Sequence, residues 1–137
     1  MIFNANPENY EKELELLGAM GDMELLYKNS SPNSSMPGNT NITLAHDNYD
    51  YLIPIFKNST TGTCYKGSIV KKGQGIYETT GAFPSAGARI HFRALTYVND
   101  TTYKTGANYW VGSSGGVFGV GDDNNAIIIT EIYGFKA

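Results

Sequence analysis

The chain has 137 residues, the length of one domain, of which 41% are hydrophobic and only 17% are charged. It is too apolar and too rich in aromatic residues for a disordered protein, and unusually poor in charge for an ordinary cytosolic enzyme. The formal net charge is −3 and the largest basic cluster is the pair Lys71-Lys72, which argues against a nucleic-acid-binding protein.

Signals for export, membrane insertion and disulfide formation are missing from the sequence. No apolar run is long enough to span a membrane, and the opening residues lack the basic and apolar regions of a secretory signal peptide. Cys64 is the only cysteine, so no disulfide can form within one chain. We expect a protein that is made in the cytoplasm and is neither exported by a standard signal nor bound to a membrane.

A helix is predicted only near the N-terminus, over residues 6–18. An Asn-Pro pair suits its first turn and Gly18 suits its end. Its apolar residues have the four-then-three spacing of a coiled-coil seam and are Tyr10, Leu14 and Leu17. Because a seam of less than two heptads is not stable alone, this helix either lies on the rest of the domain or forms the end of an oligomeric stalk.

From residue 22 onward, short strand-like segments alternate with turns rich in Gly, Asn, Ser and Thr. Strands are predicted over residues 22–28, 40–45, 49–56, 63–72, 75–79, 87–98, 101–105, 108–112 and 126–135, with a weaker candidate at 116–120. This spacing without interleaved helices predicts an all-β fold, an antiparallel β-sandwich or jelly roll of about eight strands with a short N-terminal helix. We divide the chain into a helical attachment or oligomerisation segment over residues 1–21 and a β-sandwich domain over residues 22–137.

Two of these segments carry further information. In residues 87–98, neutral side chains alternate with Arg89, His91 and Arg93, which is typical of a half-buried antiparallel strand whose apolar face packs on the core. The neutral set is Ile90, Phe92, Ala94, Thr96 and Val98. In residues 49–56, Pro54 removes a backbone donor and therefore predicts an edge strand or a bulge.

The glycine-rich stretch GSSGGVFGVGDDN (112–124) is a candidate for ion binding. It lacks the lysine of a phosphate-binding loop and leads into a strand pattern instead of a helix. The neighbouring residues Asp122, Asp123, Asn124 and Asn125 could supply oxygen ligands for calcium, but adjacent residues of an extended chain point in opposite directions and the EF-hand alternation is missing. We favour hairpin turns here, keep calcium as the minor alternative, and expect no cofactor.

No arrangement of residues predicts catalysis. The segment HDNYD (46–50) gathers a histidine and two aspartates, but a metal site would need distant partners, so we favour a polar turn. Cys64 lies in a predicted strand and is expected to be a small buried hydrophobe and not a nucleophile. Glu78 and Glu131 are the only glutamates after residue 24, and nothing in their spacing selects a hydrolytic pair.

Aromatic residues next to short polar ones in the C-terminal half indicate a ligand. Aromatic faces stack on the C–H surfaces of sugars, while Asn, Asp and Ser side chains bond to sugar hydroxyls. The predicted sugar-contact set is Tyr103, Asn108, Tyr109 and Trp110. Packing in the core or between subunits is the alternative for each aromatic residue by itself.

One long segment and the C-terminal residues resemble a known group of proteins. The segment MELLYKNSSPNSSMPGNTNITLAHDNYDYLIPIF (23–56) resembles one that recurs in structural proteins of phages of Gram-positive and gut bacteria. The matching positions are Leu25, Leu26, Tyr27 (where Trp is usual), Asn29, Pro32, Ser34, Ser35, Met36 (where Phe is usual), Leu44, Tyr49, Asp50, Ile53 and Phe56, and at the end of the chain Ile132, Tyr133, Gly134, Phe135 and Lys136.

This resemblance spans residues 22–137 and implies the C-terminal β-sandwich domain of a tail or fibre-type protein, usually trimeric. Our leading expectation is a non-enzymatic phage virion structural protein, a homotrimer that meets other virion proteins and contacts host surface polysaccharide. The alternative is a capsid decoration or head-fibre protein that binds no glycan. A small glycan hydrolase using Glu78 and Glu131, and a stand-alone carbohydrate-binding module, are further alternatives.

Overall fold

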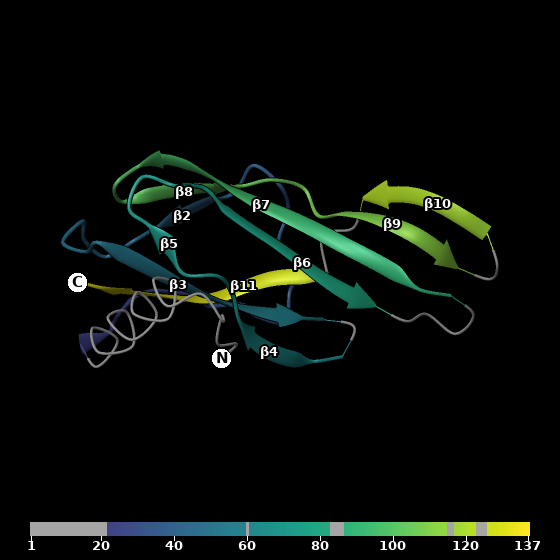
Figure 1. Cartoon of the computed structure of the whole chain (residues 1–137), viewed down its shortest axis with the longest axis horizontal. Coiled ribbons are helices and arrows are strands. Elements are labelled where there is room, and N and C mark those ends of the chain that lie inside the picture. Colours follow the sequence, from purple (N-terminus) through teal and green to yellow (C-terminus); the bar gives the residue numbers. More distant parts are fainter. Residues whose placement is uncertain (1–21, 60, 83–86, 115–116, 123–125) are drawn as a thin grey trace, which may run out of the picture.

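The computed structural model describes residues 22–137 apart from residues 60, 83–86, 115–116 and 123–125. Its described residues form strands and no α-helix (Figure 1). The strands are β1 (Glu24–Lys28), β2 (Asn41–Thr43), β3 (Tyr51–Asn58), β4 (Thr63–Lys66), β5 (Val70–Lys71), β6 (Ile76–Ala82), β7 (Arg89–Asn99), β8 (Thr102–Thr105), β9 (Tyr109–Ser114), β10 (Val117–Asp122) and β11 (Ile127–Phe135). The all-β prediction is confirmed, with more strands than the eight expected. The helix expected over residues 6–18, with Tyr10, Leu14 and Leu17, lies outside the described residues.

The strands build two antiparallel sheets in a β-sandwich-like arrangement. The five-stranded sheet has the order β1-β11-β3-β4. β4 and β5 share one edge of β3: β4 pairs with residues 55–58 and β5 pairs with residues 51–52. The six-stranded sheet has the order β10-β9-β7-β8-β2, with β6 on the remaining edge of β7. Figure 1 shows the hairpin of β9 and β10 at one end of the molecule and the C-terminus at the other.

The core lies between the two sheets and is made mostly of aliphatic residues. β11 contributes more of it than any other strand, because Ile127, Ile128, Ile129, Ile132 and Phe135 are all buried. The largest fully buried side chains are Tyr49, Tyr103, Phe56, Ile42, Leu52, Ile53, Ile76, Leu95, Ile127, Ile128, Ile129 and Ile132. A β-bulge in β11 between Ile129 and Glu131 shifts its register against β3. Such a bulge re-aims the side chains that follow it.

The long strand β7 buries the face opposite to the one that its sequence pattern favours. His91 and Arg93 are 2% exposed, whereas Ile90 is 51% exposed. The buried guanidinium of Arg93 is stabilised by backbone carbonyl acceptors: it donates to Ile127 O at 2.8 Å and also to Met36 O. Because these acceptors come from β11 and from the loop before β2, they cannot be recognised from the alternation of β7 alone.

Pro54 lies in a central strand, so the edge alternative of the prediction is wrong, and the bulge of this strand pair lies on β11, between Ile129 and Glu131, and not on β3. β3 is flanked by β11 on one side and by β4 and β5 on the other. The carbonyl of Pro54 accepts a hydrogen bond from Gly67 N–H at 2.8 Å, which shows that this residue faces the edge shared by β4 and β5. That edge is interrupted between the two short strands, so the missing N–H of proline breaks no ladder bond there.

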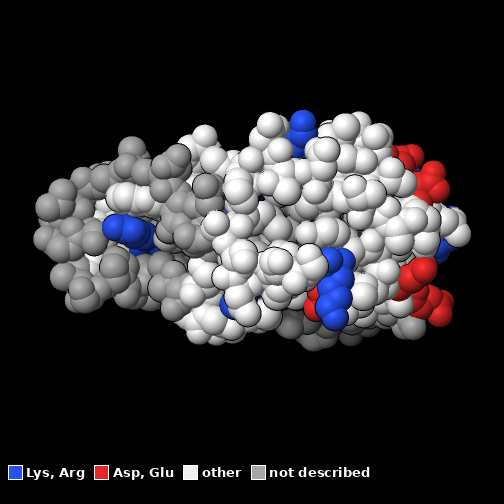
Figure 2. All heavy atoms as spheres, turned by 180° about the vertical axis from the view of Figure 1, so that it is seen from behind, with Lys and Arg blue, Asp and Glu red and all other residues white. Residues whose placement is uncertain are grey.

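The surface is poor in charge, as the composition predicts. On the face drawn in Figure 2, basic side chains are scattered and acidic ones gather toward one end. In the part of the chain that the structure describes, no helix has the length and apolar character needed to cross a membrane.

Candidate ligand-binding groove

Three neighbouring strands turn aromatic side chains outward around a shallow cavity of about 350 Å³, here called the groove. β6 contributes Tyr77, β7 contributes Phe92 and β9 contributes Tyr109, which are 75%, 40% and 59% exposed. Neighbouring strands lie about 4.8 Å apart, so the groove crosses roughly 10 Å of the sheet from β6 to β9. Its lining residues are Ser68, Tyr77, Glu78, Thr79, Phe92, Arg93, Ala94, Gly106, Ala107 and Tyr109.

The groove is hollow because small residues form its floor at a break in the strand pairing. One edge of β7 pairs with β9 over residues 89–92 and with β8 over residues 95–99, so the chain passes from β8 to β9 beside Ala94. It does so through Gly106, whose N–H donates to Ala94 O at 2.7 Å. A Cβ on Gly106 would lie 3.2 Å from that oxygen, which is a tight contact. Ala94, Gly106 and Ala107 thus leave open space between the aromatic rings.

Two charged residues border the groove without turning their charged groups toward it. Glu78 on β6 pairs with Arg93 on β7, so its side chain shares the inward face of the sheet, where its Oε1 accepts a hydrogen bond from the backbone N–H of Ser68 at 2.9 Å. Arg93 also lines the groove, but its guanidinium lies inside the sandwich, bonded to the carbonyls of Met36 and Ile127. The groove therefore presents aromatic surface and uncharged hydrogen-bonding groups, among them Ser68 and Thr79.

The structure does not bring the four predicted sugar-contact residues together. Tyr103 and Asn108 are completely buried, which makes them inaccessible to a surface glycan. Tyr109 is exposed at the groove, whereas its neighbour Trp110 belongs to the opposite face of β9 because successive strand residues alternate. The guanidinium of Arg89 lies 4.0 Å from the centre of the Trp110 ring, a cation–π arrangement.

Asn108 positions the groove residue Tyr109. Its Oδ1 accepts a hydrogen bond from Ile127 N–H at 3.1 Å, so its Nδ2 is directed at His91 Nδ1, also at 3.1 Å. These two bonds tie the start of β9 to β11 and to β7.

Sequence reasoning missed Tyr77 and Phe92 as groove residues. The available signal was the alternation of β7, which places Phe92 on a single face with Ile90 but does not say that this face is outward.

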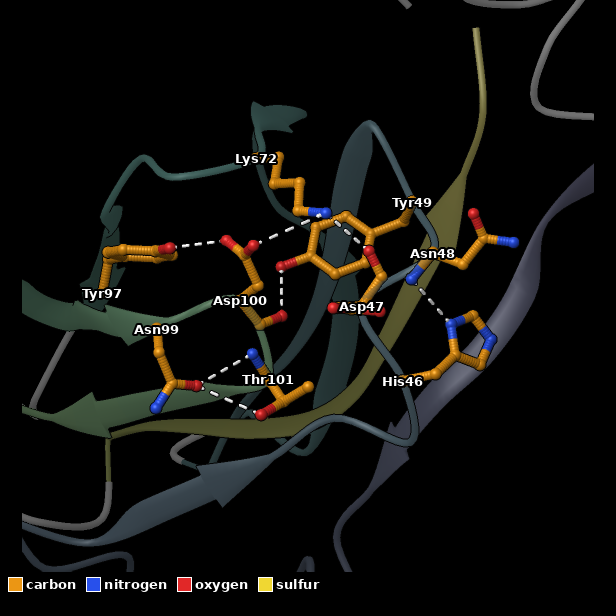
Figure 3. Close-up of polar contacts among 9 residues, drawn as sticks. All are labelled: His46, Asp47, Asn48, Tyr49, Lys72, Tyr97, Asn99, Asp100 and Thr101. Atoms are coloured by element: carbon orange, nitrogen blue, oxygen red, sulfur yellow. Dashed lines mark hydrogen bonds and ion pairs between the residues drawn. The ribbon is translucent and has the colours of Figure 1, made fainter.

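A second polar group, the Asp100 cluster, consists of Tyr49, Lys72, Tyr97 and Asp100 and joins three loops (Figure 3). The turn between β7 and β8 places it at the end of the molecule away from β10 (Figure 1). The hydroxyl of Tyr97 donates to Asp100 Oδ1 at 2.5 Å, and that of Tyr49 donates to Asp100 O at 2.7 Å. The Lys72 ammonium lies 3.7 Å from Asp100 Oδ2 and 5.1 Å from the centre of the Tyr49 ring. These contacts hold the turn between β7 and β8 against the loops before β3 and after β5.

The environment of the cluster raises the pKa values of its phenols. Burial, followed by the negative charge of Asp100, raises the pKa of Tyr49 to about 12. The pKa of Tyr97 is also raised, mainly because its hydroxyl donates to the Asp100 carboxylate. The raised pKa values extend to higher pH the range over which both hydroxyls stay protonated and donate hydrogen bonds.

The segment HDNYD (46–50) forms part of this end of the molecule. His46 Nε2 lies 2.8 Å from Glu24 Oε2, Asp47 O accepts a bond from Lys72 Nζ at 2.6 Å, and Tyr49 is buried. The segment thus forms a polar turn whose backbone and side-chain groups bond to other loops and to β1. Among the described residues, no group of three or more His, Cys, Asp or Glu side chains is placed to hold a metal ion. The candidate calcium residues 123–125 lie outside the described part.

A second cavity of about 280 Å³ lies over β3, β4 and β11, and the predicted hydrolytic pair is divided between it and the groove. Glu131 lines this second cavity, with Lys28, Lys57 and Cys64, whereas Glu78 lines the groove. Cys64 is exposed on β4, so the expectation of a buried cysteine is wrong. β4 is a short strand at the outside of its sheet, where the sequence pattern alone overestimates burial.

Comparison with protein-family models gives no match to this chain, and neither the curated proteins nor the solved structures include one that matches. The chemistry of the groove and the resemblance noted in the sequence therefore carry the functional assignment.

Proposed function

We propose that this protein is a phage virion structural protein whose β-domain binds a glycan of the host surface in the groove. The observation that carries the proposal is the pair of exposed rings, Tyr77 and Tyr109, set on either side of Phe92 around a hollow of about 350 Å³. Exposed aromatic rings with nearby hydrogen-bonding groups suit the apolar and hydroxyl-bearing faces of sugars. The virion assignment rests on the resemblance of residues 22–137 to phage structural proteins.

The positions of the carboxylates support binding without catalysis. A glycoside hydrolase needs two carboxyl groups facing the same glycosidic bond, about 5–10 Å apart. The side chain of Glu78 lies on the inward face of β6, away from the groove, and Glu131 belongs to β11 in the other sheet, where it accepts a hydrogen bond from the hydroxyl of Tyr133 at 2.7 Å. Binding by a single shallow groove is expected to be weak. Display of three copies in a homotrimer would strengthen it by about two to four orders of magnitude.

The proposal is tested by presenting the labelled full-length protein to an array of bacterial surface glycans and then titrating the ligands that are retained. Tyr109→Ala removes one stacking face and should weaken binding about tenfold. Val98→Ala is the matched control, because Val98 lies on the same outward face of β7 and is half exposed, but does not line the groove. The proposal fails if no glycan is retained, or if both variants bind as the wild type does.

A second candidate, a decoration or head-fibre protein without glycan binding, is favoured by the apolar character of the same face. Ile90 and Phe92 are 51% and 40% exposed, and exposed apolar side chains grouped on one face are typical of protein interfaces. Light scattering at micromolar concentration would compare the wild type with Ile90→Asp. A wild-type trimer that Ile90→Asp converts into a folded monomer would favour assembly as the role of this face.

A further inference from the structure

We infer that residues 1–21 of this chain pack on the outer face of its own five-stranded sheet and form a third layer there. The outer face is the side of that sheet turned away from the six-stranded sheet, and the inference does not depend on the proposed function. Strand pairing places Leu25 of β1, Tyr133 of β11 and Ile53 of β3 in one row on this face. Ile53 follows Leu52, which belongs to the core between the sheets, so the side chain of Ile53 points the other way.

Ile53 is buried although it does not point into the core. It is 1% exposed, and Phe135, which shares its face through the pairing with Tyr51, is 2% exposed. Neither of them belongs to the cluster of buried residues packed between the sheets. On the outer face of the six-stranded sheet, by contrast, Ile90 of the central strand β7 remains 51% exposed. A side chain on an open sheet face stands roughly perpendicular to the sheet and keeps its tip in water, so Ile53 has a cover that belongs to neither sheet.

The N-terminal residues of the chain can supply this cover. Residues 1–21 lie outside the described part and lead into β1, the edge strand that carries Leu25. The helix predicted over residues 6–18 would be about 20 Å long, and two strand spacings, from β1 to β3, measure only about 10 Å. Such a helix is long enough to cover the row. Its predicted apolar residues, which would face the sheet, are Tyr10, Leu14 and Leu17.

The charges of the two surfaces favour this segment over a second copy of the same face. Residues 1–21 hold four glutamates and one lysine. The outer face carries one lysine on each of four strands, and Glu131 is the acidic residue paired into the same rows. These lysines are Lys28, Lys57, Lys66 and Lys71. Two copies of the face placed together would bring lysines against lysines, whereas the N-terminal segment brings carboxylates to them.

Thiol labelling of the full-length protein tests whether the cover exists. Single cysteines are introduced into the Cys64→Ser protein, which removes the exposed native thiol. Ile53→Cys lies under the proposed cover, Ile90→Cys lies on the open face of the other sheet, and Ile76→Cys lies in the core. Iodoacetamide should modify Ile53→Cys at least about a hundredfold more slowly than Ile90→Cys, because a covered thiol reacts only after local opening. Equal rates at these two positions would overturn the inference.

Substitutions in the N-terminal segment then test whether that segment is the cover. Leu14→Asp together with Leu17→Asp places two charges on the side that would face the sheet. The pair should accelerate the labelling of Ile53→Cys about tenfold and leave Ile90→Cys as it was, since only the cover is opened. Acceleration of Ile53→Cys that does not exceed the acceleration of Ile76→Cys would overturn the inference, because Ile53 would then be opened only by unfolding of the whole domain.

Carbodiimide cross-linking of the wild type separates the chain's own segment from that of a second copy. The reagent joins carboxylates to amines in contact with them, so it should link glutamates of residues 1–21 to lysines of the outer face. Unlabelled and isotope-labelled chains are mixed in urea, refolded together, cross-linked, digested and analysed by mass spectrometry. We expect each link to lie within chains of one isotope. Links that join the two isotopes would overturn the inference in favour of an intermolecular stalk or a second copy on this face, and the absence of links to these lysines would overturn it as well.

Discussion

The Asp100 cluster and the groove are both built around tyrosines, but the two regions use them in opposite ways. At the cluster, the phenol hydroxyls of Tyr49 and Tyr97 donate to Asp100, and the adjacent Tyr103 is completely buried. At the groove, Tyr77 and Tyr109 lie mostly in solvent. A tyrosine of the cluster has a hydrogen-bond acceptor for its hydroxyl and other residues packed over its ring, so it stabilises the fold. A tyrosine of the groove has its ring exposed, so the ring remains available to a ligand.

This difference between the two regions is tested most strongly by removing one tyrosine ring from each of them and comparing the stability of the two variants. Tyr103→Ala should lower the free energy of unfolding by about 3–5 kcal/mol, because it deletes a buried ring from the core. Tyr109→Ala should change it by less than about 0.5 kcal/mol, as is usual for exposed positions. Urea unfolding followed by circular dichroism measures both values.

A third variant separates the ring of Tyr103 from its hydroxyl. This hydroxyl donates to Gln74 O at 2.7 Å, so Tyr103→Phe should cost about 1 kcal/mol, well below the alanine variant. Equal losses for Tyr103→Ala and Tyr109→Ala would contradict the division of the tyrosines into framework and ligand-facing groups.

A somewhat smaller loss is expected from the buried side of β7, directly beneath the groove. Arg93→Met keeps the length of the side chain but removes the donors to Met36 O and Ile127 O. Leaving two carbonyls without these bonds should cost about 2–4 kcal/mol, measured by urea unfolding. Lys104→Met, in which the lysine is only partly buried on β8, is the control and should have little effect. An Arg93→Met variant as stable as the wild type would mean that water replaces the guanidinium at both carbonyls.

Arg93 also shows where sequence reasoning succeeds and where it cannot. The all-β fold and most strands follow from short runs of β-branched and aromatic residues between turn residues, and these are local properties. The period of two in β7 was equally visible, and it correctly separates Ile90 and Phe92 from His91 and Arg93. Which of these two faces is buried depends on acceptors more than thirty residues away, which no local pattern contains.

The same limit explains the candidate site. Tyr109 was identified because an aromatic residue beside short polar ones is a local feature of the sequence. Asn108 was placed on the surface for the same reason, but it is buried because Ile127 and His91 happen to supply partners from β11 and β7. Tyr77 could not be assigned to the groove, because its neighbours there come from β7 and β9 and meet it only through strand pairing.

High pH should lower the free energy of unfolding by less for each tyrosine than the substitutions Tyr103→Ala and Arg93→Met do. It tests the buried tyrosines directly, because their hydroxyls are the groups that ionise. Burial raises the pKa of Tyr49 and of Tyr65 to about 12 each, whereas phenols of an unfolded chain titrate near pH 10. Between pH 10 and pH 12 the unfolded chain therefore binds fewer protons than the folded protein, so the free energy of unfolding falls as the pH rises. The stabilisation is complete below pH 10 and is lost as the pH approaches 12. Ionisation of each of these tyrosines should lower the free energy of unfolding by about 1–2 kcal/mol, after allowance for solvent near the hydroxyls.

Urea unfolding at pH 8 and at pH 11 measures this loss, and Tyr49→Phe isolates one contribution to it. Phenylalanine cannot ionise, so the variant should lose less stability than the wild type over the same pH interval, although it is less stable at pH 8 because the bond to Asp100 O is missing. Tyr109→Phe is the matched control, because it removes a hydroxyl from a mostly exposed ring at the groove and not from the core. If Tyr49→Phe instead followed the wild-type profile, the hydroxyl of Tyr49 would be open to water in the folded protein and its bond to Asp100 O would not protect it.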